Sequence, residues 1–170
     1  FPSLTVDLFA NTVLFTDHNR DANPDREWYD SIARFYMELL PNVRGVVLKR
    51  RHSRDSNLRN GQLLLGDDIS TSIIENGVNY ALDLQLNQDS SFYPDTRNLR
   101  LWLTAHMIGA RVLNCFAYTG ALGISALAGG AKEVLQTDLN RQFLAVSERS
   151  AAINGFPGEM KLLAQDFYPT

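Results

Sequence analysis

The sequence predicts an α/β protein in which a small α+β domain precedes the N-terminal half of a doubly wound, Rossmann-like sheet. The first prediction comes from residues 1–90, where strand-like runs surround one strong helical stripe. The second comes from the region after about residue 95, where strand and helix patterns alternate regularly. We therefore expect two domains, at residues 1–90 and 91–170, that meet near residues 88–98.

The first domain is expected to open with a β-hairpin, because residues 4–18 alternate around Ala10-Asn11-Thr12. A helix follows, with Asn23-Pro24 as its cap and Pro41 as its end. Its buried stripe is expected to contain Trp28, Ile32, Phe35 and Leu39. Further strands are predicted at residues 46–52, 62–66, 71–75 and 78–86, with Glu75-Asn76-Gly77 as a hairpin turn between the last two.

The second domain is expected to read β-α-β-α-β after an initial helix that carries Leu99, Trp102, Leu103, His106 and Met107 on one face. The strands are predicted at residues 111–117, 133–138 and 160–166, and the helices at 119–128 and 141–153. Such a run forms a parallel sheet with helices on its faces. The first strand should be central in a complete sheet, yet the chain supplies strands for only one side of it. We therefore expect a fragment whose other flank is covered by another chain.

The amino-acid composition is typical of a globular protein and excludes some kinds of site. The 170 residues are 45% hydrophobic and 21% charged, as in ordinary globular proteins. The single cysteine, Cys115, excludes an internal disulfide and a cysteine-cluster metal site, so no metal is expected. The sequence contains neither a membrane-spanning apolar run nor a signal peptide, and a cytoplasmic location is expected. Because the chain begins at Phe1, we expect the native protein to extend upstream.

The net charge of −3 gives no general attraction to nucleic acid, but basic residues are concentrated between Arg44 and Arg59. Lys49, Arg50, Arg51 and Arg54 are therefore candidate contacts to RNA phosphates. The alternative is a solvated strand edge or loop, which is also the simpler interpretation for His52.

Small and acidic residues follow the predicted parallel strands, where such sheets bind ligands. Tyr118-Thr119-Gly120-Ala121 follows the first strand, Asp138 follows the second, and Asp166 follows the third. Together these features indicate an adenosine pocket. The turn lets a ligand approach the backbone, Asp138 can accept from ribose hydroxyls, and Asp166 can accept from an exocyclic amine. Only Gly120-x-x-Gly123 remains of a dinucleotide fingerprint, so a nicotinamide dinucleotide is disfavoured. The alternative is that each feature simply makes a tight turn or caps a helix.

Two segments carry a resemblance to a known family: NGVNYALDLQLNQDSSFYPDTRNLR and RVLNCFAYTGALGISALAGGAKEVLQTDLN, with N-C-F-A-Y-T-G at 114–120 as the most specific motif. They resemble the S-adenosylmethionine (SAM)-dependent methyltransferases that form 5-methylcytosine in bacterial large-subunit ribosomal RNA. The resemblance implies a central α+β domain, which in the family lies between an RNA-binding PUA domain and the methyltransferase domain. It also implies SAM as cofactor and RNA as partner.

The resemblance further implies the cofactor site. Tyr118, Thr119 and Gly120 would line the methionine side, Asp138 would hold the ribose, and Asp166 with Phe167 would frame the adenine. Arg97 and the neighbouring aromatic residues would border the methionine end. The full predicted set of cofactor-binding residues is Phe92, Tyr93, Arg97, Phe116, Tyr118, Thr119, Gly120, Asp138, Leu139, Asp166 and Phe167. Pro94, Thr96 and Ala121 depart from the family pattern.

No catalytic residue is expected in this chain. Formation of 5-methylcytosine requires a nucleophile, and in the family that cysteine lies downstream of a position equivalent to Thr170. Cys115 matches a strand-end position instead and is expected to be a buried, inert thiol. The fragment alone should therefore be inactive. Two other functions remain open, a non-catalytic RNA- or partner-binding module and a nucleotide-dependent oxidoreductase half-domain, and homo-oligomerisation is also left open.

Overall fold

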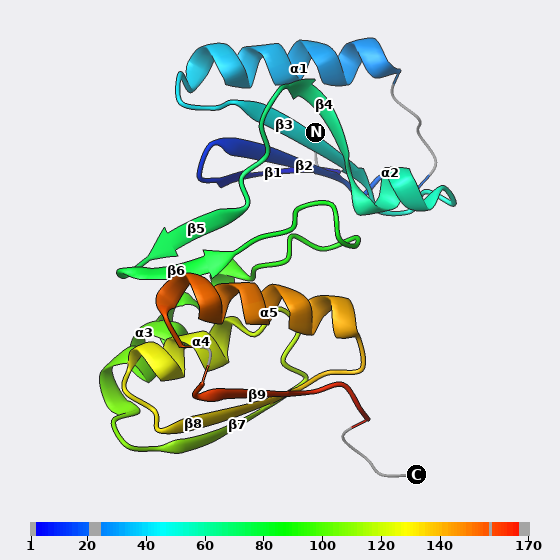
Figure 1. Ribbon diagram of the computed structural model, residues 1–170. Coiled ribbons are helices and arrows are strands. Elements are labelled where there is room, and N and C mark those ends of the chain that lie inside the picture. Colours follow the sequence, from blue (N-terminus) through cyan, green and yellow to red (C-terminus); the bar gives the residue numbers. More distant parts are fainter. Residues whose placement is uncertain (1–2, 21–24, 157, 167–170) are drawn as a thin grey trace. The chain divides into compact units, whose positions relative to one another are not determined.

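The computed structural model describes residues 3–20, 25–156 and 158–166, and the chain forms two compact units (Figure 1). Unit 1 contains residues 1–71 and 83–90, and unit 2 contains residues 72–82 and 91–170. The expected boundary at residue 90 differs from this division in one segment. Residues 72–82 belong to unit 2, because the second strand of their hairpin packs on a helix of that unit.

Unit 1 is built on a four-stranded sheet with the order β1-β2-β3-β4. Its strands are β1 (Leu4–Phe9), β2 (Thr12–Asp17), β3 (Gly45–Arg50) and β4 (Gln62–Gly66), which confirms the predicted opening hairpin and the next two strands. Strands β2 and β3 are parallel and the other neighbours are antiparallel. The crossover between β2 and β3 contains helix α1 (Arg26–Leu39), which covers one face of the sheet (Figure 1). A short helix, α2 (Ser56–Asn60), precedes β4 and has no predicted counterpart.

Helix α1 presents a different face to the core from the predicted one. Its fully buried residues are Tyr29 and Ala33, and Tyr36 packs beside them against Phe15. Trp28 and Ile32 pack at the edge of this core, whereas Phe35 and Leu39 are exposed. The helix begins after Asp25, whose side chain accepts a hydrogen bond from the backbone N–H of Trp28. The predicted cap, Asn23-Pro24, lies outside the described residues.

The predicted hairpin around Asn76-Gly77 is present in unit 2 as β5 (Ser72–Glu75) and β6 (Val78–Ala81). Asn76 and Gly77 both adopt positive φ, 52° and 79°, as a two-residue hairpin turn requires. Strand β6 docks on helix α5 (Arg141–Asn154) through polar side chains. Ser150 accepts from the N–H of Ala81, and the Asn154 amide group pairs with both backbone groups of Asn79.

The second sheet of unit 2 is parallel, with the order β7-β8-β9. It contains β7 (Arg111–Cys115), β8 (Glu133–Thr137) and β9 (Met160–Leu163), joined by α4 (Ala121–Ala128) and α5 and preceded by α3 (Arg97–His106). All of these elements were predicted. Successive right-handed crossovers in one direction place both helices on the same face of the sheet (Figure 1). Ala126, Leu127 and Val134 form the core beneath them.

The opposite face of this sheet is much more accessible. Leu113 is 57% exposed on it, and Arg111, Glu133 and Lys161 form a chain of ion pairs at one end. Strand β7 is an edge strand of the described residues, so the chain supplies neighbours on one side of it, as expected. Within the described residues, no helix is both long and apolar enough to cross a membrane.

Candidate functional site

The turn between β7 and α4 adopts an unusual backbone conformation. Phe116 and Tyr118 have φ of 55° and 53°, and Gly120 has φ of 78°. A positive φ at non-glycine residues costs roughly 1–3 kcal/mol each and persists only where neighbours hold it. The holding contacts are the Ala117 N–H, which donates to the Thr137 carbonyl at 2.8 Å, and the Tyr118 N–H, which donates to Asp138.

Asp138 connects two strand ends. Its Oδ2 accepts from the backbone N–H of Tyr118 at 2.8 Å, and its Oδ1 accepts from the N–H of Asn140 at 2.9 Å. A carboxylate offers about four acceptor positions, so two remain for further donors. Leu139, the next residue in the chain, is 70% exposed, and Phe116 in the turn after β7 is 72% exposed. An anionic acceptor and exposed apolar side chains at the ends of neighbouring strands suit a ligand that combines ribose hydroxyls with an aromatic ring.

The two glycines of the turn serve packing as well as ligand access. A Cβ on Gly120 would lie 2.1 Å from the Ser147 Oγ, and one on Gly123 would lie 2.5 Å from the Gln136 Cδ. Gln136 is fully buried, and its amide donates to Ser147 at 2.6 Å. Gly123 therefore lets α4 approach β8 closely, and Gly120 lets the turn approach α5. Close helix–strand packing is one of the roles that glycines have in nucleotide-binding βαβ units.

Residues 91–96 form one side of the site and are fastened at two points. At the first, the Ser91 N–H donates to the Tyr118 hydroxyl at 3.1 Å, and the Thr119 hydroxyl donates to the Ser91 carbonyl at 2.6 Å. The Tyr118 ring also packs against Tyr93, with centroids 5.0 Å apart. The segment is thus connected directly to the turn after β7.

The second fastening point is Arg100 of α3, which is 1% exposed. Its guanidinium forms a two-point ion pair with Glu75 at 2.6 and 2.8 Å and donates to the Tyr93 carbonyl and the Thr96 hydroxyl. It also lies 4.1 Å from the centre of the Phe92 ring. Each nitrogen of the buried Arg100 guanidinium donates a hydrogen bond, so the side chain has little freedom to move. Arg100 therefore holds residues 93–96 in place. The sequence does not predict this pair, since nothing in the local pattern joins residues 75 and 100.

A pocket of about 140 Å³ lies at the carboxyl end of β7. Tyr93 and Thr96 of segment 91–96 line one side, which we call the rim. The other lining residues come from the end of β7, the turn and the start of α4: Asn114, Cys115, Phe116, Ala117, Tyr118, Thr119, Ala121 and Leu122. The structure therefore brings together Tyr93, Phe116, Tyr118 and Thr119 from the predicted cofactor set. Cys115 is half-buried and lines the pocket, which corrects the expectation of a buried thiol.

Other predicted cofactor residues lie around or beneath this pocket. Phe92 is buried under Arg100 and packs against Tyr80, so it supports the rim from below instead of facing a ligand. Arg97 is exposed at the start of α3, next to Thr96. Asp166 is exposed three residues after β9, the strand beside β8. Phe167 lies outside the described residues.

The predicted RNA contacts all lie in unit 1, and one of them needs correction. Lys49 has no exposed surface, and its ammonium group donates to the carbonyls of Asn87 and Asp89 at 2.5 and 2.6 Å. Burial lowers the pKa of Lys49 to about 8, partly opposed by Asp89 and Asp83. It is a structural residue, because strand alternation turns it toward residues 83–90.

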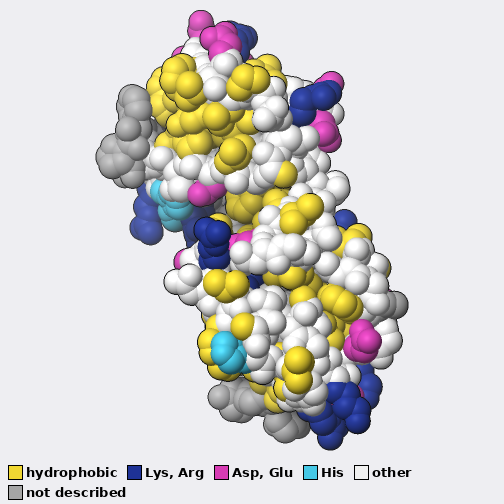
Figure 2. Space-filling view, turned by 90° about the vertical axis from the view of Figure 1, so that its left-hand side faces the viewer, with side chains coloured by type: hydrophobic (Ala, Val, Ile, Leu, Met, Phe, Trp, Pro, Cys, Tyr) yellow, Lys and Arg dark blue, Asp and Glu magenta, His cyan; other side chains and the backbone are white. Residues whose placement is uncertain are grey.

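The neighbouring arginines are more accessible than Lys49. Arg54 is exposed, Arg50 is half-buried, and Arg51 pairs with Asp89 at 3.5 Å while remaining partly exposed. Figure 2 shows basic side chains at several separate places on the visible surface, with a histidine beside one of these groups. Among the described residues, no group of three or more potential metal ligands is present.

Comparison with known proteins identifies the family. A family profile described as S-adenosylmethionine-dependent methyltransferase matches residues 35–168. The chain belongs to this family. Its cofactor is therefore SAM, whose adenosine part contains ribose hydroxyls and an adenine ring.

Individual relatives of the chain are also methyltransferases by name. The chain is 32% identical over 157 residues to the ribosomal RNA large subunit methyltransferase I of Aeromonas salmonicida (strain A449), covering 91% of the chain and 39% of the relative. It is 28% identical over 169 residues to the ribosomal RNA large subunit methyltransferase K/L of Pseudomonas entomophila (strain L48), covering 96% and 23%. The chain thus spans about two fifths or less of the length of these relatives.

A solved structure supports the same conclusion about the cofactor. A methyltransferase-like protein crystallised with SAH (S-adenosylhomocysteine) superposes with a TM-score of 0.81 at 27% identity, covering 97% of this chain and 42% of that one. The similarity of fold extends over nearly the whole chain, so the Rossmann-like architecture predicted from the sequence is confirmed.

Proposed function

We propose that this methyltransferase chain is the cofactor-binding part of an enzyme that methylates C5 of a cytosine in large-subunit ribosomal RNA. The observation that carries the proposal is the Asp138 carboxylate, which holds the strained turn at Tyr118 and keeps acceptor positions for a ribose. The names of the two curated relatives support an RNA substrate. The N-C-F-A-Y-T-G motif at 114–120 supports the cytosine-C5 group of enzymes.

In this proposal each unit has a separate task. SAM supplies an electrophilic methyl group when it is bound. Asp138 accepts hydrogen bonds from the ribose hydroxyls of SAM. Leu139 and Asp166 frame its adenine ring, and Tyr93 and Thr119 border its methionine end. Arg50, Arg51 and Arg54 of unit 1 contact RNA phosphates, whereas Lys49 supports the fold. The nucleophile, the PUA domain and the cytoplasmic setting are further parts of the proposal for the whole protein.

Calorimetry with SAH tests the cofactor site. Asp138→Asn keeps the size of the side chain but removes the charge that strengthens hydrogen bonds to the ribose hydroxyls. We expect at least about tenfold weaker SAH binding, which corresponds to about 1.4 kcal/mol. Glu148→Gln, which removes an exposed charge from α5, is the matched control and should bind as wild type does. NAD and ATP serve as comparison ligands for the nucleotide-dependent oxidoreductase alternative.

Unchanged SAH affinity in a folded Asp138→Asn protein would contradict the site assignment, and tighter binding of NAD than of SAH would favour the oxidoreductase alternative. The substrate is tested on the full-length protein with unmodified large-subunit ribosomal RNA and labelled SAM. Digestion of the product to nucleosides should yield labelled 5-methylcytidine. Any other methylated nucleoside would overturn the cytosine-C5 part of the proposal.

A further inference from the structure

Two strained backbone positions of unit 2 are joined to each other. Ser91 has a φ of 58° and Tyr118 has a φ of 53°, although neither residue is glycine. The Ser91 N–H donates to the Tyr118 hydroxyl at 3.1 Å, and the Ser91 carbonyl accepts from the Thr119 hydroxyl at 2.6 Å. Positive φ is unfavourable for such residues and is concentrated at ligand-binding sites, where the surroundings hold it. We call these two hydrogen bonds the Ser91 joint.

The Ser91 joint controls one dimension of the pocket at the end of β7. Tyr118 and Thr119 line the pocket on the side of the turn, and Tyr93 and Thr96 form the rim. Ser91 precedes the first rim residue by two positions and is fully buried. A buried N–H or carbonyl that loses its partner is costly to leave unpaired, so the backbone shifts to satisfy it. The two hydroxyls therefore fix how far the rim lies from the turn.

Tyr118 contributes to two parts of the site through different groups. Its backbone N–H donates to Asp138 at 2.8 Å, a contact that any residue except proline can make. The contact to Ser91 depends on the Tyr118 hydroxyl. The Tyr118 ring packs against Phe143 and Tyr93, with centroids 4.6 and 5.0 Å apart, so the ring keeps its place without the hydroxyl. Tyr118→Phe therefore removes the link to the rim and keeps the link to Asp138.

We propose that Tyr118 and Thr119 are positioning residues for the amino-acid part of SAM, because their hydroxyls hold the rim at the spacing that this part of the cofactor requires. The proposal rests on the site assignment made under the proposed function, in which the rim borders the methionine end and Asp138 binds the ribose. It adds that these two halves of the site can be uncoupled. Loss of either hydroxyl should weaken ligands that carry the amino acid and spare ligands that lack it.

Calorimetry with two ligands tests this division. SAH carries the amino-acid part, whereas 5′-methylthioadenosine has the same adenosine and sulfur atom without it. We expect Tyr118→Phe and Thr119→Val each to weaken SAH binding about fivefold and to change 5′-methylthioadenosine binding by less than about twofold. Thr119→Ser keeps the hydroxyl and should bind both ligands as wild type does. Because both hydroxyls act through Ser91, the double variant should lose less SAH affinity than the product of the two single losses.

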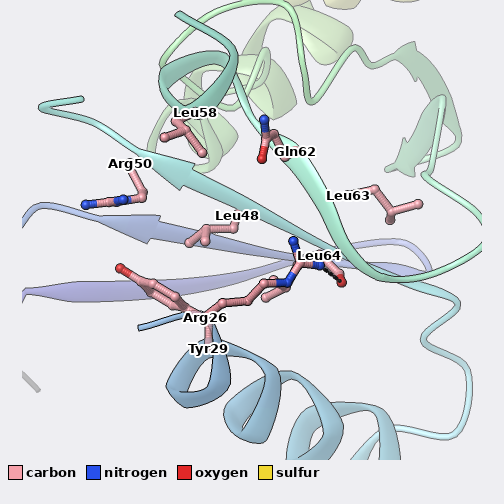
Figure 3. Close-up of a pocket in the computed structure, with 8 residues that line it drawn as sticks. All are labelled: Arg26, Tyr29, Leu48, Arg50, Leu58, Gln62, Leu63 and Leu64. Carbon is pink, nitrogen blue, oxygen red and sulfur yellow. Dashed lines mark hydrogen bonds between the residues drawn. The ribbon is translucent and has the colours of Figure 1, made fainter. Parts of the chain in front are cut away.

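Tyr29→Phe is the matched control for the tyrosine variant. Tyr29 belongs to unit 1, where its ring lines a cavity together with Leu48 (Figure 3). Its hydroxyl donates to buried Asp17 at 2.6 Å, so this change also removes a hydrogen-bonded phenol hydroxyl. We expect Tyr29→Phe to lower the thermal stability of unit 1 and to leave the affinity for both ligands unchanged. The control thus separates a loss of stability from a loss of positioning.

Unchanged SAH affinity in folded Tyr118→Phe and Thr119→Val proteins would overturn the proposal. So would equal losses for both ligands, or losses that multiply in the double variant, which would show independent contacts to the ligand. Asp138→Asn separates this proposal from the site assignment, since it should weaken both ligands alike. If Asp138→Asn weakens both ligands and the hydroxyl variants weaken neither, only the positioning role fails. If the hydroxyl variants discriminate between the ligands and Asp138→Asn has no effect, only the ribose assignment fails.

Discussion

Lys49 lies fully buried in unit 1, where its ammonium group touches two backbone carbonyls and the pKa falls to about 8. In the unfolded chain the same group regains its usual pKa of 10.5. Between these values the unfolded state binds more protons than the folded state, so the free energy of unfolding rises with pH. The unfavourable contribution of Lys49 is complete below pH 8 and disappears as the pH rises toward 10.5.

The two pKa values set the size of the effect. Each pKa unit corresponds to about 1.4 kcal/mol, so the whole difference amounts to roughly 3 kcal/mol. Between about pH 7.5 and about pH 9.5, the folded protein should gain about 2 kcal/mol from Lys49 alone. Lys49→Met removes this gain. The variant also loses two hydrogen bonds at every pH, so the comparison uses the change with pH and not the absolute stability.

The assay is urea unfolding followed by tryptophan fluorescence. In a Trp102→Phe background the remaining tryptophan, Trp28, lies in α1 and reports on unit 1. The stability difference between the Lys49 protein and Lys49→Met should change by about 2 kcal/mol across this pH range. Lys132→Met, at an exposed lysine, is the matched control and should follow the parent protein. A parallel pH dependence for Lys49→Met and its parent would refute the argument that burial controls this amine.

Two more outcomes follow from unit 2. Gly123→Ala should destabilise it by about 1–2 kcal/mol in thermal unfolding, because the new methyl group meets buried Gln136 and this overpacking outweighs the better helix propensity of alanine. The added methyl group of Gly158→Ala contacts no neighbouring atom, so this variant should keep the stability of wild type. Equal stability of the two variants would contradict the packing argument. Glu75→Gln leaves the Arg100 guanidinium buried without its ion pair and should cost about 3 kcal/mol of stability. It should also weaken SAH binding in protein that is still folded, since the rim loses its anchor; wild-type SAH affinity would mean that Arg100 only supports the fold.

The order of helices and strands follows closely from local sequence. The periodicity, the turn at Asn76-Gly77 and the glycine at the end of α5 each act over a few residues, so the predicted elements are nearly all present. The short helix α2 was missed because five residues give too little periodic signal. The acidic residues after β8 and β9 could likewise be placed at one edge of a sheet, because parallel strands end together.

Side-chain surroundings depend on what packs against each element, which local sequence does not specify. The stripe predicted for α1 is rotated in the structure, where Tyr29 and Ala33 face the sheet and the more apolar Phe35 and Leu39 are exposed. Local sequence predicts a surface cation at Lys49, because the two carbonyls that accept from its ammonium group belong to Asn87 and Asp89, far along the chain. Arg100 and Glu75 gave no signal for the same reason. Local patterns therefore determined the order of elements and the strand ends at which we propose that the cofactor binds, whereas long-range packing decided which charged groups are buried and which stay exposed.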